Sequence, residues 1–392
     1  MKKILTIVGA RPQFIKASAI SRVLTSKYFS DVEEVMVHTG QHYDHNMSDV
    51  FFKELGLKKE KYNLNIGSSS HAVQTAQMMI EIDKVIDIED PDAVLLYGDT
   101  NSTLASCIVA VKRHIPIIHI EAGVRSHNKK FPEEVNRLIC DHVSSMLFVP
   151  TYSGIDCLRK EGLNDDREHN YSLIQEKQVC LLNSPLVYKC GDIMYDNTLF
   201  FQEKANLYFE RVYQKNELPK HKYVLVTAHR PSNVDDSGKL KEILRFFHFL
   251  INDLGLVVVF PTHPRTKKII EQSKELKKLI DKSGIYCIPP VSFIEMVGLE
   301  KNAELIVTDS GGVQKEAYFM NKPCLIMLEE TPWVELLETG NAKLVGNNYD
   351  SLCKGAKDFI ERKNYSFKKI YGDGNSAKFI CEKIYENLVV KN

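Results

Sequence analysis

The chain has 392 residues, of which 44% are hydrophobic and 26% are charged, and its 51 lysines and arginines balance 51 aspartates and glutamates. This length suits two domains of ordinary size, and the composition is that of a soluble globular protein. A net charge of zero excludes a global attraction to nucleic acid or to an acidic membrane, so an anionic ligand must be held by local groups.

The amino terminus reads MKKILTIVGARPQFIK, and its apolar run stops at Gly9, before Arg11 and Pro12. This early stop argues against a signal peptide, and we interpret the run as a first strand. No later apolar stretch approaches the roughly 20 residues that span a bilayer. The nine cysteines form no CxxC pair, which argues against a disulfide framework and a zinc ribbon. We therefore expect a protein of the reducing cytoplasm that binds neither membrane nor nucleic acid.

Short apolar runs rich in valine and isoleucine recur between helical stretches. They form two sets, at 4–8, 34–38, 93–97, 116–120 and 146–150, and at 223–227, 256–260, 285–289, 304–308 and 323–327. Continuous apolar strands separated by helices indicate parallel sheets that are covered on both faces. The two sets predict an α/β protein with two doubly wound, Rossmann-like domains.

The stretch at 163–190 is weakly periodic and polar at its start, so we expect an elaborated loop there and a domain boundary near 190. The sequence thus predicts one domain over 1–190, a second over 191–370, and a tail over 371–392. In the tail, apolar residues recur every four positions, which predicts a helix with one apolar face that packs on the first domain. These residues are Ile380, Ile384 and Leu388.

In open α/β sheets, ligands bind beyond the carboxyl ends of the strands, so we searched those positions for functional residues. Arg11 and Lys16 follow the first strand, near a helix start at Pro12. Two cations at such a place suit a diphosphate, and solvated surface charges are the alternative interpretation.

Acidic residues end two other strands of the first set. Asp99 follows the strand at 93–97, and Glu121 follows the strand at 116–120. The helix that begins with PEEVNR carries Glu134 in its first turn and Arg137 one turn later. Any one of these acids is ordinarily a cap or an ion-pair partner. Two acids at successive strand ends instead favour a shared site.

Strands of the second set end in residues that suit an anion. His229 with Arg230, and His263 with a nearby arginine, each follow a strand, which favours an anion site over structural histidines. The stretch TDSGGVQKEA, from 308 to 317, places glycines between a strand and a helix, where backbone N–H groups attract a phosphate. On this stretch alone, an ordinary βα turn is an equal alternative. The residues concerned are Ser310, Gly311 and Gly312, with Glu316 placed to accept from ribose hydroxyls.

A metal site is not expected, because the histidines at the strand ends of the second set, His229 and His263, lack HxH or HxxxH spacing. The first domain thus offers acids and bases, and the second offers a cationic cradle lined by glycine. This combination suits a sugar nucleotide.

Nine motifs occur along the chain in a recognisable order: GARPQFIK, HTGQHYDHNMS, YGDTNSTLAS, HIEAGVRS, PEEVNR, TAHR, PTHPR, TDSGGVQKEA and YGDG. In this order and spacing, over nearly the whole chain, they resemble the non-hydrolysing UDP-N-acetylglucosamine 2-epimerase family. The resemblance implies the GT-B architecture, with two Rossmann-like domains facing a cleft and the C-terminal helix returning to the first. It also implies a homodimer.

The implied reaction inverts carbon 2 of a UDP-N-acetylhexosamine without a metal or a nicotinamide cofactor. UDP is eliminated and then added back after a proton returns to the other face of carbon 2. By resemblance, Asp99, Glu121 and Glu134 share the proton transfers, and His229 stabilises the leaving diphosphate. Arg11 and Lys16 bind the diphosphate as well. The glycine turn binds the phosphates, and Glu316 binds the ribose.

The chain departs from the pattern of members that act on UDP-N-acetylglucosamine. It has Ala10 and Gln13 in the first motif, Pro231 and Ser232 after TAHR, and Leu328 and Trp333 where arginines are usual. These forms look more like the branch that epimerises UDP-2,3-diacetamido-2,3-dideoxyglucuronic acid. Some members bind a second substrate molecule as an activator, and Gln41, His42, Arg230 and His263 are the candidates here.

Three other functions remain open at this point. A hydrolysing relative would release N-acetylmannosamine and UDP, but its first motif differs. A glycosyltransferase of the same architecture would not need three acids. A catalytically silent binding protein would be expected to lack one of them, and all three are present.

Overall fold

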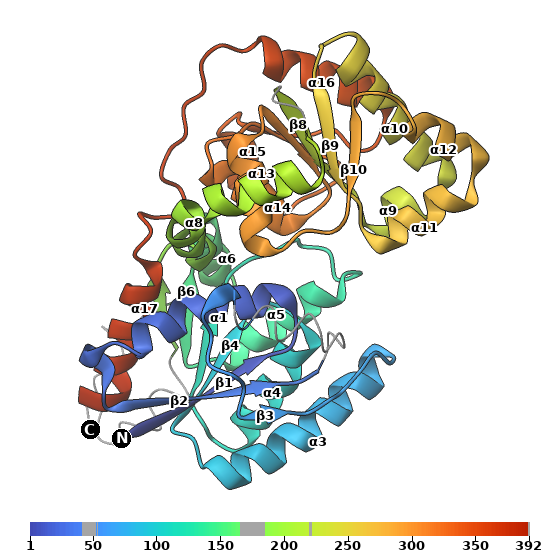
Figure 1. Ribbon diagram of the computed structural model, residues 1–392. Coiled ribbons are helices and arrows are strands. Elements are labelled where there is room, and N and C mark those ends of the chain that lie inside the picture. Colours follow the sequence, from blue (N-terminus) through green and yellow to red (C-terminus); the bar gives the residue numbers. More distant parts are fainter. Residues whose placement is uncertain (41–51, 53, 165–184, 219–221, 391–392) are drawn as a thin grey trace. The chain divides into compact units, whose positions relative to one another are not determined.

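A computed structural model describes residues 1–40, 52, 54–164, 185–218 and 222–390 (Figure 1). The chain forms two compact units. Unit 1 comprises residues 1–197 and 369–392, and unit 2 comprises residues 198–368. The chain passes between them within helix α8 (Ile193–Lys215) and again before the C-terminal segment.

Unit 1 contains a sheet of parallel strands in the order β3-β2-β1-β4-β5-β6-β7. The strands are β1 (Lys2–Val8), β2 (Val32–His38), β3 (Tyr62–Asn63), β4 (Ala93–Tyr97), β5 (Ile117–Ile120), β6 (Met146–Val149) and β7 (Leu186–Lys189). The five predicted strands of the first set are confirmed. They are almost entirely buried where they carry valine, isoleucine and leucine.

Two edge strands were not predicted. β3 has two residues, and β7 lies within the stretch for which we expected a loop. That expectation was wrong for 186–189, because these residues pair in parallel with β6, from Met146 opposite Leu186 onward. Most of the remaining stretch, 165–184, lies outside the described residues.

The helices of unit 1 are α1 (Arg11–Leu24), α3 (His71–Glu89), α4 (Asn101–Lys112), α5 (Pro132–Val143), α6 (Tyr152–Lys160) and α17 (Ser376–Tyr385), with a 3₁₀ turn at Lys27–Phe29 and a π-helical turn at Glu386–Val390. Their beginnings follow from local chemistry. The side chains of Ser70, Thr100 and Thr151 accept hydrogen bonds from the first turns of α3, α4 and α6, and proline stands in the first turns of α1 and α5.

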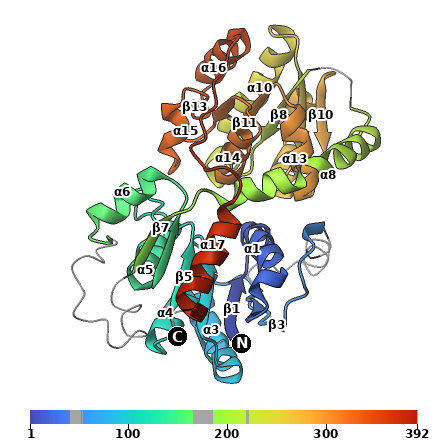
Figure 2. The same ribbon diagram turned by 90° about the vertical axis from the view of Figure 1, so that its left-hand side faces the viewer.

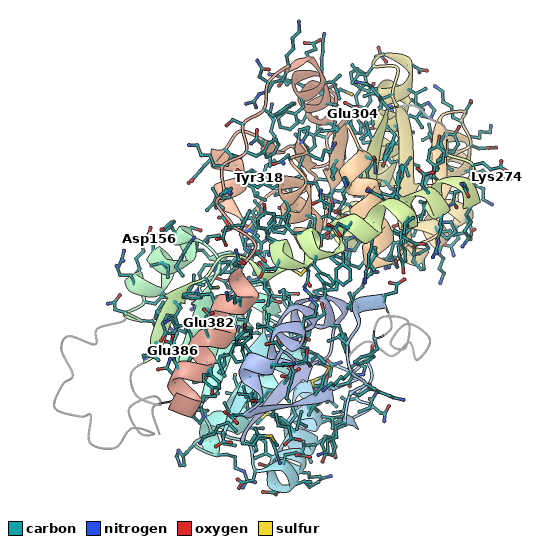
Figure 3. The ribbon with its side chains drawn as sticks, turned by 60° about the vertical axis from the view of Figure 1, so that its left-hand side comes forward. Asp156, Lys274, Glu304, Tyr318, Glu382 and Glu386 are labelled. Atoms are coloured by element: carbon teal, nitrogen blue, oxygen red, sulfur yellow. The ribbon has the colours of Figure 1, made fainter. Side chains whose placement is uncertain are left out.

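Helix α17 lies beside α1 (Figures 1 and 2). The backbone N–H of Ala377 donates to Asp196, and the thiol of Cys381 lies against the carbonyl oxygen of Ile20. Ile380 and Ile384 are fully buried, whereas Glu382 and Glu386 lie on the exposed side of this segment (Figure 3). The segment therefore has the apolar face that its four-residue spacing predicts.

Unit 2 also contains a sheet of parallel strands, in the order β10-β9-β8-β11-β12-β13. The strands are β8 (Tyr223–Thr227), β9 (Val257–Pro261), β10 (Ile285–Ile288), β11 (Leu305–Thr308), β12 (Cys324–Ile326) and β13 (Ala342–Leu344). The helices are α9 (Pro231–Val234), α10 (Ser237–Asn252), α11 (Pro264–Gln272), α12 (Lys274–Ile280), α13 (Phe293–Asn302), α14 (Gly311–Phe319), α15 (Val334–Glu338) and α16 (Tyr349–Glu361). The five predicted strands are confirmed, and β13 was not predicted.

Each sheet has a topological switch point, where successive connections run in opposite directions. In unit 1 it lies between β1 and β4, and in unit 2 between β8 and β11. Ligands of doubly wound folds bind at the carboxyl ends of strands at such points. The fold thus directs attention to the residues that follow these four strands.

No helix in the described part of the chain combines the length and the apolar character needed to cross a membrane.

Candidate functional site

The turn after β1 is tied to the end of β4 by Gln13. Its amide oxygen accepts hydrogen bonds from the backbone N–H groups of Gly9 (2.8 Å) and Ala10 (3.0 Å), and its amide nitrogen donates to Tyr97 O (2.9 Å) and Thr103 Oγ1 (3.1 Å). Gln13 is buried and all four bonds stay inside unit 1. It thus fixes the two strand ends of the switch point relative to each other.

Lys16 and Glu121 form an ion pair above the end of β4. Lys16 Nζ lies 2.7 Å from Glu121 Oε1, and both side chains are about nine-tenths buried. Gly98, with φ of +63°, lies beneath the pair, and a Cβ there would be 3.3 Å from Lys16 Nζ. Glycine at this position therefore gives the pair its space and the chain its left-handed turn. Arg11, the first residue of α1, is half-buried.

Arg137 joins the other two acids. Its guanidinium pairs with Asp99 through Nη2 and with Glu134 Oε2 through Nη1, the latter at 3.1 Å. The Asp99 side chain is 25% exposed, which leaves it accessible to a ligand. The three predicted acids are therefore brought together at the carboxyl edge of β4 and β5, with Lys16 and Arg137 between them.

Glu134 is held more tightly than the other two acids. Its carboxylate accepts hydrogen bonds from the backbone N–H (2.9 Å) and hydroxyl (3.0 Å) of Ser126, from the backbone N–H of His127 (2.9 Å), and from Arg137. Burial by itself would raise its pKa, but the bonds from Ser126 and His127 outweigh burial and lower the pKa of Glu134 below its ordinary value. Glu134 is thus a firmly ionised, weakly basic carboxylate.

The backbone at Glu121 is strained. Its φ is +72°, a left-handed conformation that a glutamate rarely adopts and that surrounding contacts must maintain. The adjacent His119 is fully buried, and its Nδ1 lies 2.7 Å from Asp141 Oδ1 while its Nε2 lies 2.8 Å from Gly98 O. Both partners are acceptors, so both ring nitrogens must carry protons. His119 is therefore an imidazolium.

Asp141 extends this buried network to the loop after Glu121. Its Oδ2 accepts from the Gly123 backbone N–H at 3.0 Å and pairs with Arg125 Nη1 at 2.7 Å. Burial alone would raise the pKa of Asp141 and lower that of His119. The attraction between Asp141 and His119 outweighs burial. It lowers the pKa of Asp141, to which Arg125 also contributes, and it raises the pKa of His119 well above its usual value. The network holds the backbone on both sides of Glu121.

In unit 2, the buried carboxylate of Asp309 organises the turn after β8. It accepts from the backbone N–H groups of His229 and Arg230, both at 2.9 Å, and from Asn233, and it lies 3.0 Å from His229 Nδ1. Burial would raise its pKa, but these hydrogen bonds, that of His229 foremost, lower it. Because Nδ1 faces Asp309, Nε2 is the nitrogen of His229 that can reach a ligand.

His263 begins α11 and lies beside His229, with ring centroids 5.7 Å apart. Its Nδ1 accepts from the backbone N–H of Arg265 at 3.2 Å. Burial, then the nearby His229 and Arg265, lower the pKa of His263 below its ordinary value. At neutral pH it is consequently an uncharged ring whose Nε2 carries the proton.

The start of α14 leaves space for a ligand. Ser310 is the N-cap, but its hydroxyl makes no capping hydrogen bond. A Cβ on Gly311 would meet no atom nearer than Trp333 Nε1 at 3.9 Å, and one on Gly312 none nearer than Glu316 Oε1 at 3.8 Å. Neither glycine has a left-handed φ. The protein's own packing therefore does not require glycine here, and the first-turn N–H groups are left open to an anion.

The family model for UDP-N-acetylglucosamine 2-epimerase matches residues 26–385 of this chain. The chain belongs to the UDP-N-acetylglucosamine 2-epimerase family. A UDP-N-acetylglucosamine 2-epimerase homolog from Methanococcus maripaludis is 40% identical over 386 residues, which cover 97% of this chain and 98% of that protein. The UDP-2,3-diacetamido-2,3-dideoxy-D-glucuronate 2-epimerase of Pseudomonas aeruginosa is also 40% identical, over 380 residues, with 97% and 98% covered.

Among solved structures, the UDP-GlcNAc 2-epimerase of Methanocaldococcus jannaschii, in complex with UDP-GlcNAc and UDP, is 38% identical to this chain. It matches with a TM-score of 0.84 and covers 98% of this chain and 99% of its own. These matches confirm both the family and the GT-B fold class that the sequence predicts.

Some positions of this epimerase-family chain were not recognised from sequence. Asp309 lies inside the quoted TDSGG motif, and Asp141 lies inside the helix that begins with PEEVNR, but nothing in one sequence reveals which buried groups they bind. Gln13 was noted only as a departure from the family pattern. Gln41 and His42, predicted for a second substrate molecule, lie outside the described residues.

Trp333, another departure from the epimerase pattern, covers a buried lysine. Lys315 Nζ lies 3.9 Å from the centre of the indole ring, in cation–π geometry, and both side chains are buried. The tryptophan thus replaces a cationic side chain with an aromatic one near the start of α14, while the positive charge of Lys315 is kept beneath it.

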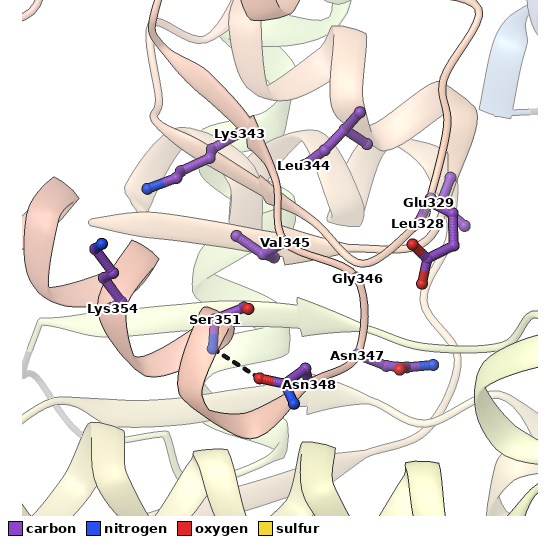
Figure 4. Close-up of a pocket in the computed structure, with 10 residues that line it drawn as sticks. All are labelled: Leu328, Glu329, Lys343, Leu344, Val345, Gly346, Asn347, Asn348, Ser351 and Lys354. Carbon is purple, nitrogen blue, oxygen red and sulfur yellow. Dashed lines mark hydrogen bonds between the residues drawn. The ribbon is translucent and has the colours of Figure 1, made fainter.

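An open pocket of unit 2 lies beyond the carboxyl ends of β12 and β13 (Figure 4). It is lined by Leu328, Glu329, Lys343, Leu344, Val345, Gly346, Asn347, Asn348, Ser351 and Lys354. Asn348 Oδ1 accepts from the Ser351 backbone N–H at 3.1 Å and so caps α16, which accounts for its placement. None of the residues predicted for the active site of this epimerase family member lines the pocket.

Proposed function

We propose that the protein is a non-hydrolysing 2-epimerase that inverts carbon 2 of a UDP-N-acetylhexosamine. The reaction is of the type that converts UDP-GlcNAc to UDP-ManNAc. The observation that carries this proposal is the grouping of Asp99, Glu121 and Glu134 at the switch point of unit 1, held by Lys16 and Arg137. Membership of the epimerase family supports the same reaction. Several acids at one point suit a carbon that must lose and regain a proton on opposite faces.

In the proposed reaction, a base removes the proton from carbon 2 while the C1–O bond to UDP breaks. The electron pair of the C–H bond forms a C1–C2 double bond, and UDP leaves with the electrons of the C–O bond. An acid then protonates carbon 2 on the opposite face, and a diphosphate oxygen adds back to carbon 1. No net oxidation occurs, so the residues of the chain suffice without a redox cofactor.

Asp99 and Glu121 are the groups that we propose for the two proton transfers. Asp99 follows β4 at the switch point and Glu121 follows the neighbouring β5, and each is paired with a cation that also limits repulsion between the carboxylates. Glu134 is a weak base because its carboxylate already accepts four hydrogen bonds. We propose that it keeps Arg137 in place beside Asp99, rather than moving a proton itself.

In each unit taken by itself, we propose residues that suit the nucleotide. In unit 2, the N–H groups at Gly311 and Gly312 and the hydroxyl of Ser310 suit the phosphates, and Glu316 suits the ribose. His229 in its doubly protonated form, which donates from Nε2 while Nδ1 faces Asp309, and the neutral Nε2–H of His263 are suited to donate to the leaving diphosphate. Arg230 is held by Asp309 O through its Nε at 3.0 Å. Arg11 and Lys16 are the cations that we propose for the diphosphate in unit 1.

Two substrates are supported by relatives that are equally similar to this chain. A UDP-N-acetylglucosamine 2-epimerase homolog and a UDP-2,3-diacetamido-2,3-dideoxy-D-glucuronate 2-epimerase are both 40% identical to it. The same reaction on that uronic acid is therefore our second candidate.

We further propose a cytoplasmic homodimer that supplies a precursor of surface polysaccharide. The described cysteines are all free, which supports a reducing compartment. Val73, Ala76 and Ile80 lie on the exposed side of α3, which supports burial of that face against a second copy. Sedimentation velocity showing only monomer at micromolar concentration would contradict the dimer.

Proton NMR in D₂O tests the function directly. The protein is incubated separately with UDP-N-acetylglucosamine and with UDP-2,3-diacetamido-2,3-dideoxyglucuronic acid. We expect one of them to give a new UDP-sugar, epimeric at carbon 2, with solvent deuterium at that carbon. Free sugar with stoichiometric UDP would instead establish a hydrolysing enzyme.

A further inference from the structure

Glu121 has a backbone conformation that its side chain does not favour. Its φ is +72°, in the left-handed region that glutamate rarely adopts. The backbone N–H groups of Glu121 and Ala122 both donate to one carbonyl oxygen, Phe148 O, at 3.1 Å. A strained conformation persists only where its surroundings determine it, so contacts beyond this shared acceptor should matter for the position of Glu121.

His119, on β5 two residues before Glu121, ties its strand to the turn after β4. Its ring Nε2 donates to Gly98 O at 2.8 Å, and the Gly98 backbone N–H donates to Ile120 O at 3.0 Å. Gly98 is thus bonded on both sides to the two residues that directly precede Glu121. The His119 side chain is fully buried, so bulk water offers no substitute donor to Gly98 O.

The other ring nitrogen of His119 acts on the backbone that follows Glu121. Nδ1 lies 2.7 Å from Asp141 Oδ1, and Asp141 Oδ2 accepts from the Gly123 backbone N–H at 3.0 Å. Gly123 has a φ of +77°, and a Cβ there would stand 2.6 Å from Gly154 O, so this backbone is closely packed as well. One imidazole therefore connects the turn after β4 with the backbone on both sides of Glu121.

The buried charges around His119 are balanced when its ring is an imidazolium. Arg125 Nη1 lies 2.7 Å from Asp141 Oδ2, and its Nε and Nη2 donate to the two carboxylate oxygens of Glu161, at 2.8 and 2.7 Å. Two cations thus accompany two carboxylates. The thiol of Cys140, which faces the ring, stays neutral because burial raises its pKa well above the ordinary value. A neutral ring would leave one of its two acceptors without a donor.

The turn that His119 holds lies next to the acid that we propose for proton transfer. A Cβ on Gly98 would stand 3.5 Å from Glu121 Oε1 and 3.3 Å from Lys16 Nζ, and these two atoms are 2.7 Å apart. A shift of Gly98 would therefore press on the Lys16–Glu121 pair or leave it unsupported. Displacement of a reacting group by about 1 Å can cost about 10²-fold in rate.

We propose that His119 is a positioning residue: as a buried imidazolium, it fixes the carboxylate of Glu121 where it can exchange a proton with carbon 2 of the substrate. It does so through its hydrogen bonds to Gly98 O and to Asp141. Both of its N–H groups are committed within unit 1, so it acts through Glu121 and not on the substrate. The inference rests on the proposed function, in which Glu121 transfers a proton.

The first test removes one of the two donors. In His119→Asn, the amide nitrogen can take the place of Nδ1 and donate to Asp141, but nothing reaches Gly98 O. We expect kcat to fall about 50-fold and UDP affinity to change by less than about threefold, because Lys16 and the nucleotide groups proposed in unit 2 are retained. Steady-state kinetics and UDP calorimetry measure the two quantities. An unchanged kcat, or equal losses of kcat and UDP affinity, would overturn the proposal.

Ser145→Ala is the matched control. Ser145 Oγ accepts from the backbone N–H of Ile117 at 3.2 Å, at the end of β5 that lies away from Glu121. This variant also removes a buried hydrogen bond of the same strand, but its kcat should stay within about twofold of the unmodified protein. A loss of kcat as large as that of His119→Asn would show that any weakening of β5 suffices, which would contradict a specific role for His119.

Coupling to Glu121 provides a second test. In a Glu121→Gln background the proposed proton-transfer group is already absent, so His119→Asn should lower kcat by no more than about twofold further. A further loss near the full factor seen in the single variant would show that His119 acts independently of Glu121. Thermal unfolding of each variant establishes that the protein is folded at the assay temperature.

Nitrogen-15 NMR of histidine-labelled protein tests the charge state of the ring without relying on activity, and it needs only the unmodified protein. At about pH 8 we expect one histidine with protons on both ring nitrogens, which exchange slowly with solvent because the ring is buried. The lack of any such histidine would overturn the proposal. If this histidine were observed but the protein epimerised neither UDP-sugar, the proposed function would fail instead.

Discussion

The switch points of units 1 and 2 have the same strand order, yet they hold opposite kinds of group. After β1, β4 and β5 in unit 1 stand carboxylates paired with Lys16 and Arg137, and the loop that carries Glu121 is strained. In unit 2, His229 follows β8, His263 follows the neighbouring β9, and the helix start after β11 is left open by two glycines. One topology thus presents carboxylates in one unit and groups suited to an anion in the other, because the strand ends present whatever side chains follow them.

The largest expected effect would come from removing a proton-transfer group of unit 1. Glu121→Gln keeps the side-chain shape but cannot accept or release a proton in the required range, so kcat should fall about 10³-fold. Its affinity for UDP should change far less than kcat, because Lys16 and the groups of unit 2 that we propose for the nucleotide all remain. Steady-state kinetics, deuterium incorporation at carbon 2 and UDP calorimetry measure these quantities. If UDP affinity fell by as large a factor as kcat, the role that we propose for Glu121 in proton transfer, as opposed to nucleotide binding, would be contradicted.

Next in size is the buried network behind Glu121. Asp141→Asn leaves the His119 imidazolium and Arg125 without their common anion, which should lower the free energy of unfolding by about 3 kcal/mol. Because the pKa of His119 is raised in the folded protein, His119 contributes fully to the free energy of unfolding below pH ~6.5. This contribution is lost as pH rises through its folded-state pKa. Because the pKa of Asp141 is lowered in the folded protein, Asp141 contributes fully to the free energy of unfolding above pH ~3.9. This contribution is lost as pH falls through its folded-state pKa.

The difference in stability between the unmodified protein and Asp141→Asn should therefore be greatest around pH 6 and shrink in acid. Denaturant unfolding at several pH values provides the test. A difference that stays constant from pH 7 to pH 3 would show that Asp141 is not held as an anion by His119 and Arg125.

A smaller effect is expected at the glycine turn of unit 2. Gly312→Val should fill the space that we assign to a phosphate and weaken UDP binding by about 2 kcal/mol, or about 30-fold, with little change in thermal stability. Gly238→Val is the matched control, since Gly238 is likewise the second residue of its helix, α10. Equal UDP affinities for the two variants would show that the space above Gly312 is not a ligand site.

The sequence predicted the parts of this fold whose signal is local. Long apolar runs such as those of β4 and β8 are buried on both faces and are recognisable one strand at a time. β3, β7 and β13 have two to four residues and exist because a neighbouring strand offers them an edge, which no local pattern reveals.

The same distinction holds for the site. Asp99, Glu121 and Ser310 follow predicted strands, so their positions could be inferred from the rule that ligands bind at strand ends. The partners of Asp309 and Asp141 could not, because each depends on side chains that are brought near only by folding, such as His229 for Asp309. Sequence therefore predicted the groups that we propose for the ligand, and the structure was needed for the groups that hold them.

The interleaving of the two units bears on how the protein is made. During synthesis, all of unit 2 leaves the ribosome before residues 369–392, which complete unit 1. Until α17 arrives, the surface of α1 around Ile20 and the carboxylate of Asp196 lack their native cover. A nascent chain should thus hold a finished second unit and an unfinished first one. Chaperone crosslinking to stalled chains should accordingly concentrate on α1, and should end once α17 is free to dock.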